Sequence, residues 1–342
     1  MSEPKGYLAI LLHAHLPYVR HARGDAYLEE KWYYEALTET YIPLYTMLAK
    51  LASEGVPYRL TVSLSPTLMS MCRDRLLQER FSQFIDGLCR LAELETVRTR
   101  WQPGFRETAE MYLERFQHVR SVYNDALQRD VVGGFARLAG EGRLELITTA
   151  ATHGYLPLME VCPSAARAQI VAAVDYYRRT FGTAPRGMWL PECGYYPGVD
   201  AYLREAGVRY FCTDAHGIEN ASPRPRYGVY APIYCPSGVA AFGRDMESSK
   251  QVWSANEGYP GDFDYREFYR DIAYDLDWDY IRPFMGGCPA RTHTGIKYYR
   301  VTGRTEHKQP YVREWAVNKA ATHAGNFVFN RERQIEHLAS VM

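Results

Sequence analysis

The sequence lacks an excess of either charge, a paired-cysteine motif and a long apolar run. Lys and Arg number 40, as do Asp and Glu, so no net field attracts nucleic acid or anionic lipid. The 7 cysteines are odd in number and form no C-x-x-C pair, which argues against a zinc ribbon or a disulfide framework. No stretch approaches the ~20 apolar residues of a membrane span. The composition favours a cytoplasmic protein with reduced thiols that binds a neutral partner rather than nucleic acid or membrane.

Short apolar runs alternate with longer amphipathic stretches, which is typical of an α/β protein with a parallel sheet or barrel. The 342 residues fit one barrel with loop insertions, so the length does not require two domains. The runs contain few polar residues, as expected of strands that are buried on both faces. We expect strands at five of them: residues 7–12, 59–64, 145–150, 187–190 and 210–213.

Helices are predicted where apolar residues recur every three or four positions. One such stretch covers 164–181, where Ser164 is a candidate N-cap and Gly182 a stop signal. Others cover 37–51, 77–91 and 112–123. The period disappears in two stretches, and we expect a loop-rich inserted subdomain at about 220–262 and an irregular segment at about 286–309.

Polar side chains follow the predicted strands. His13 and His15 follow the first, His153 the third, Glu192 the fourth and Asp214 the fifth. In a barrel the loops after the strands converge on one face, where active sites form. Each residue alone is more readily a structural, hydrogen-bonded side chain, and one His-x-His is a weak metal signal. Their recurrence at the same strand ends favours a site, because buried polar groups without partners are costly.

Glu192 is the strongest candidate among these residues. It follows the apolar run Met188-Trp189-Leu190-Pro191, which would hold its carboxylate rigidly at the rim of a barrel. A rigid carboxylate beside aromatic side chains suits attack on an anomeric carbon, where positive charge develops on the sugar ring. The competing interpretation is a structural Glu that caps the next helix or pairs with an Arg.

At these positions the sequence resembles a known family. Three segments resemble, in order, the first three motifs of glycoside hydrolase family 57: HAHLPY at 13–18, ATHGY at 151–155 and WLPECGY at 189–195. Longer strings resemble its bacterial 1,4-α-glucan branching-enzyme branch: PSGVAAFGRD, GYPGDFDYREFYRD and KYYRVTG. The resemblance extends from about residue 6 to residue 342.

The resemblance implies a (β/α)7 barrel, which is an irregular TIM-like fold, and a retaining mechanism without metal or cofactor. Glu192 matches the family nucleophile, while His13, His15 and His153 match residues that line the donor subsite. Trp189 would form one side of that subsite. The implied substrate is an α-glucan such as amylose or a glycogen-like polymer. The implied enzyme cleaves an α-1,4 linkage and transfers the chain to a 6-hydroxyl, which creates an α-1,6 branch.

Transfer instead of hydrolysis requires a bound acceptor and exclusion of water. The candidates for this role are Tyr230, Tyr234, Trp253 and Tyr259 in the expected insertion, and Trp278 beyond it. Packing of the insertion onto the barrel is an equally good interpretation of these rings. Asp262 could bind sugar hydroxyls, although Gly-Asp is also ordinary turn chemistry.

A retaining glycosidase needs two carboxyl groups about 5–5.5 Å apart. The family takes its acid/base from an Asp in a fourth motif after a helix that resembles 318–342, and residues 1–342 contain neither that motif nor the helical C-terminal domain. We therefore expect a partial catalytic barrel, incomplete at its C-terminal end. It is a fragment, a split enzyme completed by a second chain, or a non-catalytic remnant that binds glucan. We favour a fragment with little branching activity alone. An acid within the chain, such as Asp214, is the alternative, although its position after a different strand argues against the required geometry.

Two other classes stay open. A metal-dependent polysaccharide deacetylase also has an irregular seven-stranded barrel, and His13, His15, His153 and Asp214 could supply its zinc ligands. That assignment would leave Glu192 without a role. A glucan-binding or regulatory protein would bind maltooligosaccharides without forming a covalent adduct. Metal analysis tests the first class, and trapping of a glycosyl adduct tests the second.

Overall fold

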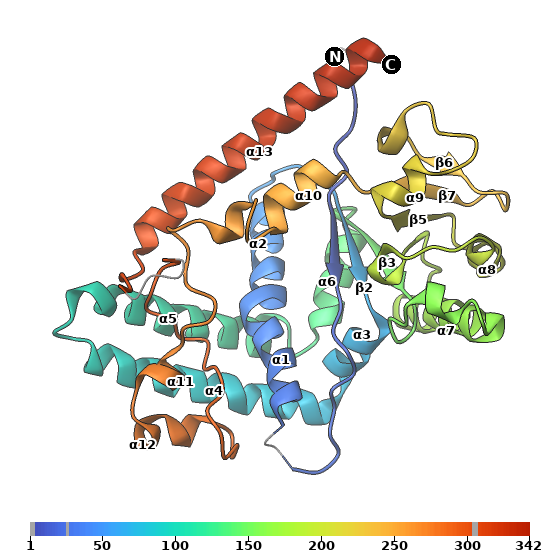
Figure 1. Ribbon diagram of the computed structural model, residues 1–342. Helices are drawn as coiled ribbons and strands as arrows, with labels where there is room; N and C mark the ends of the chain where they lie inside the picture. Colours follow the sequence, from blue (N-terminus) through green and yellow to red (C-terminus); the bar gives the residue numbers. More distant parts are fainter. Residues whose placement is uncertain (1–3, 25–26, 303–306) are drawn as a thin grey trace.

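The computed structural model describes residues 4–24, 27–302 and 307–342, and its centre is a mostly parallel sheet (Figure 1). Among these residues seven strands pair in the order β1-β2-β3-β4-β5-β7-β6. All neighbours are parallel except β6, which is antiparallel to β7. The strands are β1 (Leu11–Ala14), β2 (Leu60–Leu64), β3 (Leu144–Thr149), β4 (Gly187–Trp189), β5 (Tyr210–Thr213), β6 (Ile233–Tyr234) and β7 (Ala240–Gly243).

All five expected strands are present, and the α/β class is confirmed. The sheet is open and does not close into a barrel. Strand β1 begins four residues later than expected, because its pairing with β2 starts only at Leu11 opposite Thr61. Tyr7 before it is 86% exposed, so the apolar start of the predicted run does not enter the core.

The longer helices flank the sheet and extend to one side of it (Figure 1). The side chain of Asp74 caps the start of α4 by accepting a hydrogen bond from the Leu77 N–H at 3.0 Å. Gly182 ends α7 in a left-handed conformation with φ of 73°, as predicted. Ser164 is not the N-cap of α7, since Cys162 occupies that position and Pro163 is the first helical residue. The longer helices are α1 (Leu28–Ala36), α2 (Ile42–Ser53), α3 (Pro66–Arg73), α4 (Arg75–Arg98), α5 (Pro103–Ser121), α6 (Val131–Gly140), α7 (Pro163–Phe181) and α13 (Arg313–Val341).

Shorter elements complete the described chain. Two π-helical turns, η1 (Leu37–Tyr41) and η2 (Val122–Ala126), follow α1 and α5 directly. The short α-helices are α8 (Val199–Glu205), α9 (Ala215–Glu219), α10 (Met246–Trp253), α11 (Ile272–Asp275) and α12 (Trp278–Ile281). The 3-10 turns are η3 (Leu156–Met159), η4 (Pro191–Cys193), η5 (Gly228–Tyr230), η6 (Tyr259–Gly261) and η7 (Arg282–Phe284).

The stretch 220–262 is not only loop, because β6 and β7 lie within it. Strand β7 pairs in parallel with β5 from Ala240 opposite Tyr210 to Gly243 opposite Thr213. This part of the expected insertion therefore belongs to the central sheet. The irregular segment at about 286–309 contains isolated bridges but no helix or strand in its described part, and residues 303–306 lie outside the described residues.

The buried apolar side chains form two clusters. The larger packs β1, β2 and β3 against α1, α4, α5 and α6, and the smaller packs β4, β5 and β7 against α7 and α8. Among the described residues, none of the helices is both long and apolar enough to span a bilayer. All 7 cysteines are free thiols.

Candidate active site

Three imidazoles and one indole stack at the carboxyl ends of β1, β3 and β4. The ring centres of His15 and His153 are 3.9 Å apart, and those of His13 and His153 are 4.9 Å apart. Trp189 lies against His13, with the ring centres 5.0 Å apart and the planes inclined by 16°. The parallel register of the strands brings these residues together, as the motif positions predicted.

Hydroxyl groups at the same strand ends hold the imidazoles in place. His13 Nδ1 lies 3.1 Å from Ser63 Oγ, His15 Nδ1 3.4 Å from Thr67 Oγ1, and His153 Nδ1 3.0 Å from Thr149 Oγ1. The roles of Thr67 and Thr149 were not foreseen. The only signal in the sequence is their position, since Thr149 ends β3 and Thr67 lies in the first turn of α3, directly after β2.

Burial keeps these imidazoles neutral. Burial first, and then the neighbouring His153 and His15, lower the pKa of His13 to about 3. Burial and His153 lower the pKa of His15 to about 4, against an opposing effect of Glu192, and burial alone lowers that of His153 to about 4. Near neutral pH the stack is therefore uncharged and can exchange hydrogen bonds with a neutral ligand.

Glu192 lies at the open edge of this stack. Its side chain is 80% exposed, and Oε1 is 3.9 Å from His153 Nε2. Its backbone has φ 50° and ψ 28°, in the left-handed region that non-glycine residues rarely occupy. The turn is fixed by hydrogen bonds from Cys193 N to Leu190 O and from Gly194 N to Pro191 O, at 2.8 and 2.9 Å. The carboxylate is thus neither sealed in an Arg pair nor turned away from the imidazoles.

Asp214 lies next to this turn but is engaged elsewhere. Thr213 Oγ1 donates to the carbonyl of Cys193 at 2.9 Å, which joins the end of β5 to the Glu192 turn. Arg244, just after β7, donates to Asp214 Oδ1 at 2.5 Å. This pairing was missed because β7 was not recognised as a strand.

Tyr259 and Asp262 contact α13 rather than the imidazole stack. The ring of Tyr259 stacks on His323 with the centres 4.0 Å apart. Asp262 forms ion pairs with Lys319 at 3.4 Å and His323 at 3.3 Å. These contacts match the packing alternative for Tyr259, and they occupy the carboxylate of Asp262.

The two remaining tryptophans differ in their surroundings. Trp253 ends α10 with 59% of its surface exposed. Trp278 begins α12, is half-buried against the larger apolar cluster, and lies under the guanidinium of Arg291 at 5.6 Å. Figure 1 shows α12 on the side of the molecule away from α7 and α8. No contact in the described part of the chain joins either ring to Glu192.

The arrangement of the histidines bears on the metal alternative. Across residues 4–24, 27–302 and 307–342, no group of three or more His, Cys, Asp or Glu side chains is placed to hold a metal ion. The imidazoles of His13, His15 and His153 present ring faces to one another, with planes inclined by 21 to 25°. Metal coordination requires ring nitrogens that converge on one point.

The fold and an accessible carboxylate beside neutral imidazoles fit an enzyme that acts on glycosidic bonds. The sequence model of glycosyl hydrolase family 57 matches residues 9–338, so the chain belongs to that family. A 1,4-alpha-glucan branching enzyme from Thermococcus kodakarensis is 33% identical over 97% of this chain. The chain spans 50% of that relative's length.

Solved structures show the same fold. An alpha-amylase from Thermotoga maritima, AmyC, is 43% identical with a TM-score of 0.92, and the match covers 98% of this chain and 65% of that one. A family 57-type branching enzyme from Pyrococcus horikoshii is 33% identical with a TM-score of 0.83, over 99% of this chain and 60% of that one. The deacetylase and the non-catalytic binding protein are not favoured by these matches.

Proposed function

We propose that the chain is the larger part of the catalytic barrel of an enzyme that transfers α-1,4-glucan chains, with Glu192 as the nucleophile. The supporting observation is an exposed carboxylate that lies 3.9 Å from His153 at the edge of a neutral imidazole stack. In the proposed reaction Glu192 attacks the anomeric carbon and forms a glycosyl-enzyme, and a 6-hydroxyl of a second glucan then displaces it. The result is an α-1,6 branch.

The neighbouring residues suit the binding of a neutral sugar. His13 Nε2 is buried without a hydrogen-bond partner among the described residues, and a sugar hydroxyl would satisfy it. Trp189 and His15 stand at the two ends of the stack, so each has one ring face that no other ring of the stack covers, which suits contact with a pyranose, while His153 lies between His13 and His15. We assign these four residues to the donor subsite. Trp253, Tyr259, Asp262 and Trp278 stay candidates for more distant contacts with the glucan.

The second carboxyl group is proposed to come from outside residues 1–342. Asp214 is a poor substitute, because it is held by Arg244. The same proposal includes a single barrel unit over residues 1–342, which a second chain or a further domain completes. It also includes a cytoplasmic location and a role in glycogen-type metabolism. Hydrolysis of α-1,4-glucan is the second candidate, favoured by the 43% identity to an alpha-amylase.

A substrate that needs no acid catalyst tests the nucleophile directly. In α-glucosyl fluoride the leaving group departs without protonation, so the chain alone should form a glucosyl adduct that accumulates. Mass spectrometry of a digest should place this adduct on Glu192. Glu192→Gln should lower its rate of formation by roughly 10³-fold or more, whereas Glu141→Gln, at an exposed position, should leave it unchanged.

An adduct on another residue, or labelling that persists in Glu192→Gln, would contradict the assignment. Products separate the two candidate activities. Incubation of a longer polypeptide that includes the second carboxyl group with amylose should create α-1,6 linkages if the enzyme branches. A rise in reducing ends without new branches would support hydrolysis instead.

A further inference from the structure

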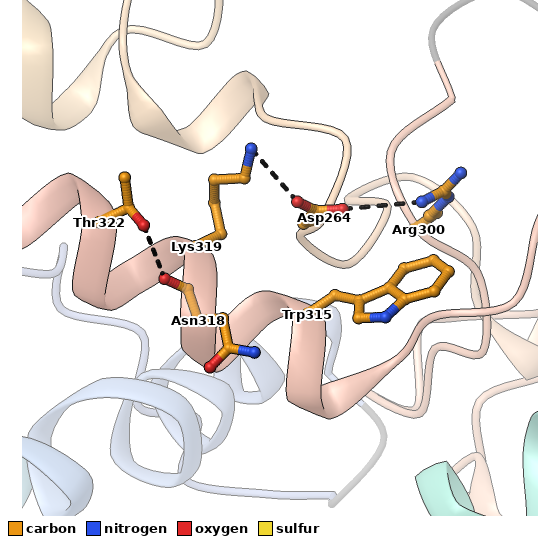
Figure 2. Close-up of a pocket in the computed structure, with 6 residues that line it drawn as sticks. All are labelled: Asp264, Arg300, Trp315, Asn318, Lys319 and Thr322. Atoms are coloured by element: carbon orange, nitrogen blue, oxygen red, sulfur yellow. Dashed lines mark hydrogen bonds and ion pairs between the residues drawn. The ribbon is translucent and has the colours of Figure 1, made fainter.

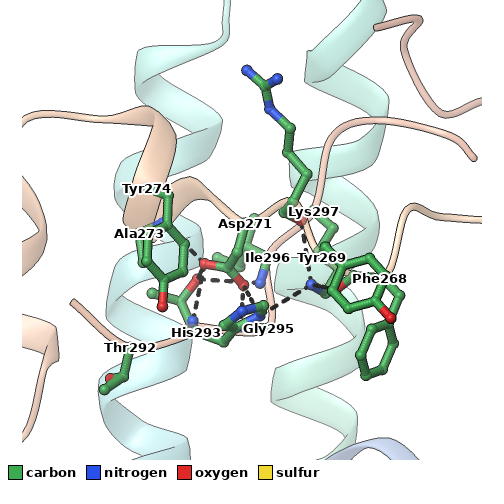
Figure 3. Close-up of polar contacts among 12 residues, drawn as sticks. Phe268, Tyr269, Asp271, Ala273, Tyr274, Thr292, His293, Gly295, Ile296 and Lys297 are labelled. Carbon is green, nitrogen blue, oxygen red and sulfur yellow. Dashed lines mark hydrogen bonds and ion pairs between the residues drawn. The ribbon is translucent and has the colours of Figure 1, made fainter. Parts of the chain in front are cut away.

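An exposed group of aromatic side chains lies beside α11, far from Glu192. Phe268 is 73% exposed, Tyr269 79% and Tyr274 52%. Phe268 and Tyr269 meet edge to face with ring centres 5.1 Å apart, and Tyr274 meets the ring of His293 at 5.3 Å. Figure 3 shows His293 and the amine of Lys297 between Tyr274 on one side and Phe268 and Tyr269 on the other. We call these five residues the aromatic surface.

A buried carboxylate fixes the two loops that carry the aromatic surface. Asp271 is 0% exposed and accepts hydrogen bonds from the N–H groups of Ala273, Thr294 and Gly295, at 2.9, 3.0 and 2.8 Å. The hydroxyl of Thr294 donates to it as well, at 2.8 Å. These bonds join the backbone around residue 272 to that around residue 295. The rings are therefore presented by an ordered scaffold, which reduces the entropy lost when a ligand binds.

The rings do not belong to the hydrophobic core. Ile272, Ala273 and Ile296, their neighbours in the sequence, are buried in the larger apolar cluster. The same loops thus place aliphatic side chains inward and aromatic side chains outward. Large apolar side chains gathered on a surface mark a binding site more often than isolated ones do.

The polar groups at the aromatic surface favour a neutral ligand. The amine of Lys297 already donates to the carbonyl oxygens of Phe268 and Arg270, and it lies 3.3 Å from His293 Nδ1. Asp271 is buried and saturated with hydrogen bonds. Little charge is left for an anion, whereas the exposed aromatic rings match the apolar faces of glucose rings.

We propose that the aromatic surface is an α-glucan-binding site separate from the site of Glu192. It rests on the proposed function, which supplies the class of ligand. The surface lies against the larger apolar cluster, whereas the Glu192 turn lies against the smaller one. Figure 1 shows α11 on the opposite side of α1 from α7 and α8. A glucan polymer can contact both sites at once, whereas a single glucose donor needs only the site of Glu192.

A pocket of about 430 Å³ lies beside α13 and is shown in Figure 2. Its carboxylate, Asp264, is paired with Arg300 at 3.6 Å and Lys319 at 3.3 Å, and Arg300 covers the ring of Trp315 at 5.2 Å. The charged groups and the aromatic ring of this pocket are therefore occupied by one another.

Retardation of the chain in native gels that contain glycogen tests the proposal. The double substitution Phe268→Ala/Tyr269→Ala should raise the apparent dissociation constant for glycogen by about tenfold or more. Tyr274→Ala, at the other end of the surface, should raise it by a smaller factor. The matched control is Tyr7→Ala, before β1, which removes an exposed tyrosine ring with 86% exposure and should have no effect. Circular dichroism and thermal melting confirm that each variant is folded.

Wild-type retardation of the double variant, or equal loss of retardation in Tyr7→Ala, would overturn the proposal. So would a change in self-association by sedimentation without a change in glycogen binding, because the rings would then contact protein. Labelling of Glu192 by α-glucosyl fluoride should be unaffected by the double substitution. Failure of that labelling in the wild type, with glycogen binding still sensitive to the rings, would overturn the proposed function and leave this inference intact.

Discussion

Three residues at the candidate active site have backbone conformations that sequence patterns do not reveal. His153, Glu192 and Cys193 all have positive φ, at 56°, 50° and 56°. Such conformations cost about 1–3 kcal/mol each and persist where the surrounding structure fixes them. Here the strand ends and the hydrogen bond from Thr213 to the Cys193 carbonyl fix the turn. The strain places the Glu192 side chain outward beside His153, as the proposed role of Glu192 requires.

The imidazole stack should make stability depend on pH. His13, His15 and His153 have pKa values of about 3, 4 and 4 in the folded chain, below the ordinary 6.5. Between pH 6.5 and about 4 the unfolded chain therefore binds more protons, and stability falls as the pH falls. Asn tolerates positive φ, so His153→Asn should keep the turn. It should flatten this loss and raise the pKa of His15 and His13, because His153 depresses both.

Urea unfolding across that pH range and NMR titration of the imidazole protons measure the two effects. His118→Asn, at an exposed position on α5, is the control and should change neither. An unchanged pKa of His15 in His153→Asn would contradict the proposed coupling within the stack.

A carboxyl group on α1 should have the opposite pH dependence. Burial, and next the neighbouring Asp271, raise the pKa of Glu35 from 4.5 to about 7, while Lys31 and Lys297 oppose the rise. Between these pH values the folded chain keeps a proton that the unfolded chain releases, so this group lowers stability as the pH rises. Glu35→Gln should be more stable than the wild type at about pH 8 and equally stable near pH 4.

The exposed Glu29 provides a matched control on the same helix, since Glu29→Gln should leave the pH profile unchanged. Chemical denaturation at the two pH values is sufficient. If Glu35→Gln gave no gain in the free energy of unfolding at about pH 8, the burial of this carboxyl group would not affect stability.

At the scale of elements, the sequence predicted most of the fold because its elements have strong local signals. Strands β2 to β5 are apolar runs, and α7 has a clear period and a glycine stop. Strand β7 was missed because Ala240 and Ala241 are weak strand formers and Gly243 closes the run. Its place in the sheet comes from pairing with β5, which is a long-range contact. The hydroxyl partners of the imidazoles and the Arg244 pair depend on the same tertiary register.

Arg331 attaches the C-terminal half of α13 to α10. Among the residues of α13 only Ala316 and Arg331 are buried. Arg331 donates to Asp245 at 3.0 Å and to Glu247 at 2.9 Å, at the start of α10. Arg331 is 4% exposed, whereas Asp245 and Glu247 are 25% and 72% exposed, so removal of the guanidinium leaves the partly buried Asp245 without its ion pair. Arg331→Ala should therefore release the helix from α10.

Amide hydrogen exchange should detect this release, with rates in α13 around residue 331 rising about tenfold or more, which corresponds to about 1.4 kcal/mol. The control Arg333→Ala removes an exposed guanidinium from the same helix. Equal exchange in the two variants would show that the α10 contact does not hold α13.

At the scale of the whole molecule, the sheet joins two apolar clusters of unequal size. Strands β2 and β3 are paired through four residue pairs, from Leu60 opposite Leu144 to Ser63 opposite Ile147. Strands β3 and β4 are paired through only two, Thr148 with Met188 and Thr149 with Trp189. The junction between the two clusters is therefore a weak point of the sheet, and it runs through the candidate active site.

We expect the part built on β4, β5 and β7 to open at a lower free energy than α4 and α5, because it buries fewer apolar side chains and has this short junction. Native-state hydrogen exchange at increasing denaturant measures the opening of each part. A maltooligosaccharide bound between His13 of β1 and Glu192 after β4 would contact both sides of the junction. It should then slow exchange in β4, β5 and β7 more than in α4, since a ligand stabilises the state that binds it. If the two parts were equally protected from exchange without ligand, the sheet would unfold as one unit. If their protection were unequal but unchanged by the ligand, the glucan would bind on one side of the junction only.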